Sequence, residues 1–166
     1  MTVPTVTQQL ATELGQLLLR KNLSITTAES CTGGGISYAI TAISGSSAYL
    51  DRSFITYSNK AKQQMLGVKS ATLLQCGAVS EDTVIEMARG AATAASATVA
   101  IAVSGIAGPT GGTPQKPVGT VCFGFAVTGH VVSMTQVFRG DRDQVRQQSI
   151  DFALQQTILL LTGDFT

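Results

Sequence analysis

The chain has little charge, and this scarcity excludes several classes of function. Only 13% of its 166 residues are charged, and 11 Lys and Arg nearly balance 10 Asp and Glu, for a formal net charge of +1. Such a chain has no basic field that could grip a nucleic-acid backbone, so we expect no nucleic-acid partner. No apolar run reaches the roughly 18 residues of a membrane span, and residues 1–9 lack the basic start and apolar block of a signal peptide. We therefore expect a cytoplasmic protein without a membrane partner.

The chain also has only three cysteines and one histidine, too few for a metal site or a histidine-based triad. Cys31, Cys76 and Cys122 lie far apart and form no CxxC pair, so neither a disulfide framework nor a zinc site is predicted. His130 follows a Thr-Gly turn between two β-rich runs, and we interpret it as an ordinary loop residue. We expect no metal and no cofactor.

Apolar residues, by contrast, are abundant: 44% of the chain is hydrophobic, enough for a sheet covered on both faces. No linker or charge run divides the sequence, so we expect one domain over residues 1–166. The apolar pattern predicts helices over residues 6–19, 36–43, 59–66, 81–97 and 141–161, and strands over 23–28, 53–57, 98–103, 118–127 and 131–138. The predicted fold is α/β, a three-layer α/β/α sandwich with a mixed sheet of about five strands.

A glycine-rich segment, AESCTGGG over residues 28–35, falls between the first strand and the helix that follows it. Backbone N–H groups without helical partners point outward at such a place and stabilise a nucleophile or an anion. The GK[ST] ending of a P-loop and the GxGxxG spacing are both missing, which argues against nucleoside triphosphates and dinucleotides. Alternatively, Ser30 or Thr32 is only a helix cap and the glycines only form a tight turn.

A tyrosine and two lysines, Tyr57, Lys60 and Lys62, follow the second strand. If that strand runs parallel to the first, they lie near Ser30 at the carboxyl edge of the sheet, where open α/β sheets bind ligands. A desolvated lysine has a lowered pKa and can take the proton of a serine hydroxyl, and Lys62 is the candidate. The alternative for either lysine is a solvated surface charge.

Two further segments could bind an anion. The loop SGIAGPTGG begins at Ser104, directly after a buried strand, and its amides could form a concave phosphate site or simply a flexible surface loop. Arg142 and Arg146 lie one turn apart in the last predicted helix and could fork onto a phosphate or carboxylate. They could equally pair with Asp143 or with surface acids.

Taken together and in order, seven motifs closely resemble the CinA carboxyl-terminal domain family over nearly the whole chain. They are AESCTGG (28–34), GSSAY (45–49), TYSNKAK (56–62), GAVS (77–80), SGIAGPTGG (104–112), KPVGTV (116–121) and GDRDQVR (140–146). For a chain without the family's amino-terminal molybdopterin-binding-like domain, the resemblance implies hydrolysis of the carboxamide of nicotinamide mononucleotide. The products would be nicotinate mononucleotide and ammonia, in salvage of the pyridine ring into NAD. The resemblance implies neither a metal nor pyrophosphatase activity.

The resemblance also implies roles for individual residues. The family's nucleophilic serine corresponds to Ser30, its lysine to Lys62 and its tyrosine to Tyr57. Ser104 stands where many relatives have threonine, and Lys60 occupies a variable position, which makes it the weaker candidate base. We expect Lys62, directly or through Tyr57, to deprotonate Ser30 for attack on the amide carbon.

Substrate binding is predicted at the same sheet edge. Amides of the turn after the first strand would hold the oxyanion, and the loop of residues 105–112 with Arg142 would hold the phosphate. The predicted binding residues are Cys31, Thr32, Gly33, Gly34, Ser104, Gly105, Gly108 and Arg142. Cys31 is the rival nucleophile, although a reactive thiolate needs a cationic or histidine neighbour.

Two other functions stay open at this point. A ligand-binding or regulatory module can keep a pocket and lose catalysis, and a Ser-Lys amidase could act on another small amide. We also expect a homo-oligomer, because the first helix and the low charge favour self-association.

Overall fold

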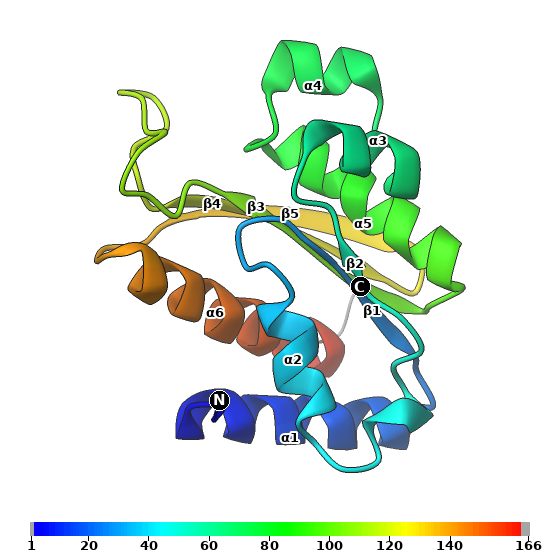
Figure 1. Ribbon diagram of the computed structural model, residues 1–166. Coiled ribbons are helices and arrows are strands. Elements are labelled where there is room, and N and C mark those ends of the chain that lie inside the picture. Colours follow the sequence, from blue (N-terminus) through cyan, green and yellow to red (C-terminus); the bar gives the residue numbers. More distant parts are fainter. Residues whose placement is uncertain (1, 164–166) are drawn as a thin grey trace.

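The computed structural model describes residues 2–163, in which helices cover both faces of one five-stranded sheet (Figure 1). The strands are β1 (Ile25–Glu29), β2 (Phe54–Ile55), β3 (Val99–Gly105), β4 (Thr120–Val127) and β5 (His130–Val137). The helices are α1 (Thr5–Lys21), α2 (Gly35–Thr41), α3 (Asn59–Leu66), α4 (Ser70–Cys76), α5 (Glu81–Ala95) and α6 (Arg142–Thr162), with a 3-10 turn at Ser46–Ala48. The predicted three-layer α/β sandwich with a mixed sheet is confirmed.

The order of the strands, β2-β1-β3-β4-β5, brings the motif-bearing loops to one edge of the sheet. β1 runs parallel to both β2 and β3, while β4 is antiparallel to β3 and to β5. The carboxyl ends of β1, β2 and β3 therefore lie together, and each is followed by one of the predicted site segments. In open α/β sheets ligands bind at this edge.

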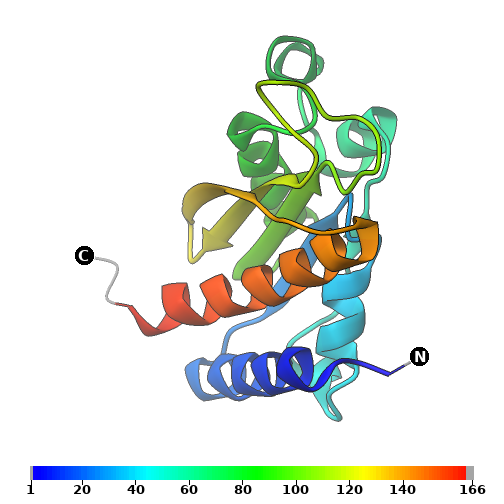
Figure 2. The same ribbon diagram turned by 90° about the vertical axis from the view of Figure 1, so that its left-hand side faces the viewer.

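Two apolar cores form, one on each face of the sheet. On one face α6 packs against β3 and β4, α2 packs against β1, and α1 packs on α2 and lies beside α6 (Figures 1 and 2). The core of this face includes Val99, Ile101 and Val103 of β3. On the other face α5 packs against Ala100 and Ala102 of the same strand, and α3 packs on α5. The alternation follows from the two-residue period of a strand. Because this second face carries small alanines, α5 approaches the sheet closely.

Several elements differ from the sequence prediction. The expected strand over residues 53–57 is reduced to Phe54–Ile55, and α4 was not predicted. In α4 only Leu73 is buried while Leu74 is 84% exposed, so the helix has no apolar stripe to reveal it. His130 is the first residue of β5, not a loop residue, because Thr128 and Gly129 alone make the hairpin turn, both with positive φ. None of the helices within residues 2–163 has the length and hydrophobicity needed to cross a membrane.

Candidate active site

The centre of the site is a buried serine and lysine pair at the carboxyl end of β1. Ser30 follows the last residue of β1, and strand alternation turns its side chain to the face that carries α3 and α5. From α3, Lys62 Nζ reaches across to lie 3.0 Å from Ser30 Oγ, and it also donates to the carbonyl oxygen of Thr56 at 2.8 Å. Only 8% of Ser30 and 1% of Lys62 are exposed. A potential nucleophile and a potential base are therefore in hydrogen-bond contact.

Burial also changes the proton affinity of the lysine. No carboxylate in residues 2–163 forms an ion pair with Lys62, since the ion pairs found there are Arg52 with Asp51 and Arg146 with Asp143. Desolvation lowers the pKa of Lys62 below its ordinary value, and only a thiolate at Cys31 would oppose this shift. A neutral amine is accordingly easier to reach than on a solvated lysine.

Cys31, the rival nucleophile, lies in an environment that suppresses its thiolate. Its side chain is buried, and burial raises the pKa of the Cys31 thiol to about 12. The Cys31 backbone amide lowers this pKa, as do the charges of Lys62 and Arg146, whereas Glu29 raises it further. A thiol with such a pKa is protonated at neutral pH and is a weak nucleophile.

A buried glutamate that the sequence reasoning missed organises the glycine-rich turn. Glu29 ends β1 with its side chain on the opposite face from Ser30, and it is fully buried. Its carboxylate accepts hydrogen bonds of 2.6 to 3.1 Å from the hydroxyls of Thr27 and Thr32 and from the backbone N–H groups of Gly34, Ile36 and Ser37. The N-cap of α2 is Gly34, without a side-chain cap, so neither Ser30 nor Thr32 caps the helix as considered above. The signal in the sequence was a carboxylate at the junction between an uncharged β-rich run and the glycine-rich segment.

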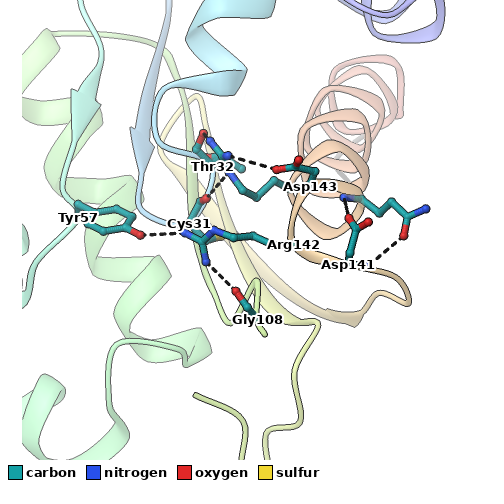
Figure 3. Close-up of polar contacts among 9 residues, drawn as sticks. Cys31, Thr32, Tyr57, Gly108, Asp141, Arg142 and Asp143 are labelled. Carbon is teal, nitrogen blue, oxygen red and sulfur yellow. Dashed lines mark hydrogen bonds and ion pairs between the residues drawn. The ribbon is translucent and has the colours of Figure 1, made fainter. Parts of the chain in front are cut away.

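At the outer rim of the site, Arg142 links two loops (Figure 3). Its Nη1 donates to the carbonyl oxygen of Gly108 at 2.8 Å, and its Nη2 donates to the hydroxyl of Tyr57 at 3.1 Å. A capping box between Asp141 and Gln144 fixes the start of α6 and so the place of Arg142. Tyr57 is 63% exposed, and no hydrogen bond in the described chain joins it to Ser30 or Lys62. The tyrosine thus lies at the entrance and not between base and nucleophile.

Arg146, one turn further along α6, contacts the glycine-rich turn itself. Its Nε donates to the carbonyl oxygen of Cys31 at 3.1 Å and its Nη2 to that of Thr32 at 3.3 Å. The ion pair with Asp143 is longer, 3.9 Å, and Asp143 is almost fully solvated. Arg146 could bind an anion or pair with Asp143, and the pairing with Asp143 is present. The shorter bonds of Arg146, however, are those to the carbonyl oxygens of the turn.

The remaining predicted residues also lie at this edge, at different depths. Ser104, near the end of β3, is buried on the same face as Ala100 and Ala102, which is also the face of Ser30. Gly105 ends β3, whereas Lys60 is exposed on α3. Within residues 2–163 no group of three or more His, Cys, Asp or Glu side chains is placed to hold a metal ion.

A cavity of about 780 Å³ borders the glycine-rich turn from the side of α1, α2 and α6. Gly33, Gly34, Ile55 and Arg146 are among its lining residues, but neither Ser30 nor Lys62 is. The turn therefore has the cavity on one side and the Ser30 and Lys62 pair on its inner side.

Comparison with known proteins identifies relatives of the whole chain. The model of a family described as the CinA C-terminal domain matches residues 7–161. The chain is 54% identical over 148 residues to the nicotinamide-nucleotide amidohydrolase PncC of Escherichia coli, covering 89% of this chain and 90% of that one. It is 50% identical to the protein of the same name from Pseudomonas putida, over 92% and 96% of the two chains. The crystal structure of a competence/damage inducible protein from Agrobacterium tumefaciens superposes with a TM-score of 0.92 at 42% identity, covering 96% of this chain and 99% of that one.

Proposed function

The chain belongs to the CinA C-terminal domain family, and from this membership we propose that it is a nicotinamide-nucleotide amidohydrolase. The resemblance found in the sequence motifs is thereby confirmed as a family relationship. The proposed reaction converts nicotinamide mononucleotide and water to nicotinate mononucleotide and ammonia, which returns the pyridine ring to NAD synthesis.

One observation carries the proposed mechanism: the 3.0 Å contact between Lys62 Nζ and Ser30 Oγ in a place that excludes water. A neutral amine there would keep donating to the Thr56 carbonyl while its lone pair accepts the hydrogen of the Ser30 hydroxyl. The lowered pKa of Lys62 makes this neutral form accessible. Ser30 and Lys62 together thus supply what a serine hydrolase otherwise obtains from a histidine.

In the first half of the reaction, Lys62 takes the proton of Ser30 as Oγ attacks the carboxamide carbon. The carbonyl oxygen of the substrate becomes an oxyanion, and amides of the turn after β1 stabilise it. When the tetrahedral intermediate collapses, the carbon–nitrogen bond breaks and the Lys62 ammonium gives its proton to the departing nitrogen. Ammonia leaves, and an ester between Ser30 and the nicotinoyl group remains.

The second half repeats the same proton transfers with water. Lys62, neutral again, takes a proton from a water molecule that attacks the ester carbon, and the intermediate collapses to release Ser30 Oγ. The proton held by Lys62 returns to Ser30, so the enzyme is regenerated. The product leaves as nicotinate mononucleotide.

The rim of the site is proposed to hold the phosphate of the substrate. Arg142 lies between Tyr57 on one side and the loop that contains Gly108 on the other. Its guanidinium has further N–H groups besides those used in these two bonds. Such a group binds phosphate with charge and direction. Ser104 and Gly105 would border the substrate between this rim and Ser30. Tyr57 would act as a wall of the entrance and not as a proton relay.

The cytoplasmic location, the homo-oligomeric state, the single domain and the independence from nucleic acid stay predictions from the sequence. They are compatible with a small-molecule substrate and are not needed for the mechanism.

The test is ammonia release from nicotinamide mononucleotide by purified, chelator-treated protein, with two variants measured beside it. Ser30→Ala removes the nucleophile and should lower turnover by several orders of magnitude while the melting temperature stays near that of the wild type. Cys31→Ser is the matched control at the next residue and should keep most of the activity, because the protonated thiol takes no part.

Other outcomes would decide between the alternatives. No release from folded wild-type protein would favour a binding module or an amidase for another amide, which a panel of small carboxamides would separate. Release that requires added metal would reject the serine and lysine mechanism. Inactivation by Cys31→Ser together with an active Ser30→Ala variant would make the cysteine the nucleophile.

A further inference from the structure

The backbone N–H groups of the turn after β1 are almost all engaged. The amide of Gly33 donates to the carbonyl oxygen of Ser30 at 3.0 Å, and that of Gly35 to the carbonyl oxygen of Thr32 at 3.0 Å. The amide of Gly34 donates to Glu29 at 3.1 Å. These three groups are therefore not available to hold an oxyanion.

Two amides of the turn remain, those of Cys31 and Thr32. The backbone amide of Cys31 faces its own thiol and lowers that thiol's pKa. The amide of Thr32 donates to no other group in residues 2–163, although the Thr32 side chain is fully buried and its hydroxyl is bound to Glu29. Buried backbone donors are nearly always paired, so an unengaged one beside a nucleophile points to a partner that arrives with the substrate.

Arg146 determines the direction of this amide. In a trans peptide unit the C=O of one residue and the N–H of the next point in opposite directions, and the bond between Cys31 and Thr32 is trans. Because Arg146 Nε holds the Cys31 carbonyl oxygen at 3.1 Å, the Thr32 N–H points away from α6. α6 covers the face of the sheet opposite to α3, from which Lys62 reaches Ser30 (Figure 1). The Thr32 N–H is thus directed away from the arginine and toward the reacting side of the turn.

We propose that Thr32 N–H is the oxyanion donor of the site and that Arg146 is a positioning residue that aims it, without itself binding the substrate. The inference rests on the proposed amidohydrolase function. The guanidinium is suited to this role because its rigid fork holds two successive carbonyl oxygens, those of Cys31 and Thr32, and so fixes two peptide planes at once. Glu29 holds the far end of the same turn through Gly34, Ile36 and Ser37.

Kinetic constants distinguish a positioning role of Arg146 from a role in binding the phosphate of the substrate. An interaction that exists only in the transition state changes kcat and kcat/KM equally, whereas lost ground-state binding raises KM and leaves kcat. Arg146→Gln should therefore lower kcat by about 10- to 100-fold, less than the complete loss of an oxyanion donor, with KM for nicotinamide mononucleotide nearly unchanged. Arg146→Lys should behave similarly, because an ammonium cannot span both carbonyl oxygens.

Asp143→Asn is the matched control. It removes the distant ion-pair partner of Arg146 but leaves its bonds to Cys31 and Thr32, so it should keep the wild-type kcat. All variants are compared well below their melting temperatures, so that a loss of folded protein does not enter kcat. If Arg146→Gln does not fold, Arg146→Lys takes its place, because it keeps the charge and most of the aliphatic stem. Its kcat and KM for nicotinamide mononucleotide then test the proposal in the same way.

A second readout uses the aldehyde analogue of the substrate, in which a formyl group replaces the carboxamide. Ser30 would add to this aldehyde and form a hemiacetal whose oxygen occupies the oxyanion position. Its affinity should fall in Arg146→Gln by the same factor as kcat/KM, while affinity for the product, nicotinate mononucleotide, stays constant. A purely structural role for Arg146 would not produce this selective loss.

Three results would overturn the inference while the amidohydrolase function stands: an unchanged kcat in both arginine variants, a raised KM with unchanged kcat, or equal losses of affinity for aldehyde and product. Wild-type protein that releases no ammonia from nicotinamide mononucleotide would instead remove the proposed function, and this inference with it.

Discussion

Gly90 of α5 lies directly against the carbonyl oxygen of Leu66 in α3, leaving no room for a Cβ atom. Leu66 is four residues after Lys62, so this contact sets how closely the helix that carries the lysine approaches α5. The backbone of α3 can come this near α5 only because residue 90 has no side chain.

We expect Gly90→Ala to displace α3 and to reduce both stability and activity. The added methyl group must push Leu66 away, a cost typical of overpacking, about 1–3 kcal/mol. The displacement also lengthens the contact of Lys62 with Ser30, so kcat should fall at temperatures where the variant is folded. Thr93→Ala on the exposed side of the same helix is the control. Equal kcat values for the two variants would show that α3 does not need this contact to place its lysine.

Removal of the buried lysine should change how stability depends on pH. The pKa of Lys62 is lowered in the folded state, so between that lowered value and 10.5 the unfolded chain binds more protons than the folded one. The free energy of unfolding of the wild type therefore rises with pH through this window, and the cost of burying the charge is fully present below it. Lys62→Met abolishes activity and removes this dependence.

Denaturant titrations near pH 6 and near pH 10 test this expectation. The stability of Lys62→Met relative to the wild type should improve as the pH falls. A difference that is the same at both values would mean that Lys62 keeps its proton with no penalty from burial. In the wild type, kcat/KM should rise with pH as Lys62 loses its proton.

Glu29→Gln should destabilise the turn strongly although the side chains have nearly the same shape. A carboxylate accepts all five hydrogen bonds, whereas one carbonyl oxygen of an amide cannot replace them and the new NH₂ group meets donors. Each buried donor left without a partner costs about 1–3 kcal/mol, so a loss of roughly 3 kcal/mol or more is expected. Glu86→Gln is the matched control, because within residues 2–163 this carboxylate binds only the amide of Lys69 and the hydroxyl of Thr72. Similar losses in the two variants would contradict the special role of Glu29.

Arg142→Gln should weaken recognition of the phosphate without changing the chemical step. KM for nicotinamide mononucleotide is expected to rise about 10-fold or more, as for loss of a charge-assisted bond, with kcat near the wild-type value. Nicotinamide riboside, which lacks the phosphate, is the internal control, since its kcat/KM should be the same in both proteins. An equal loss for the nucleotide and the riboside would show that Arg142 supports the loop at Gly108 and not the phosphate.

Local sequence signals predicted the elements that depend on local forces. The bounds of α3 agree with the prediction of a helix over residues 59–66. The parallel pairing of β1 with β2 brings Lys62 to Ser30, as expected if the second strand ran parallel to the first. β2, however, has only two paired residues, and α4 has too little apolar surface to be recognised.

What the sequence could not predict are contacts between segments far apart in the chain. The bond from Arg142 to Tyr57 spans 85 positions, and that from Arg146 to Cys31 spans 115. No propensity or spacing rule reports on such pairs, because they follow from how α6 lies across the sheet edge. Glu29 is a different case, because its partners at the start of α2 are only seven and eight positions away. The sequence analysis included it in the glycine-rich segment but gave it no role of its own.

Lys62 is buried and has no carboxylate partner in the described part of the chain, and this affects how the protein responds to salt. Exposed charges are screened by dissolved ions over a Debye length of about 8 Å at physiological ionic strength. Lys62 depends on exclusion of water and on neutral hydrogen-bond partners, so added salt should hardly alter its proton affinity or the rate of the chemical step. Dissolved ions would fully screen the attraction between Arg142, at the solvated rim, and an anion. We therefore expect kcat to change little with ionic strength, whereas the affinity of the entrance for an anionic substrate should fall as salt is added.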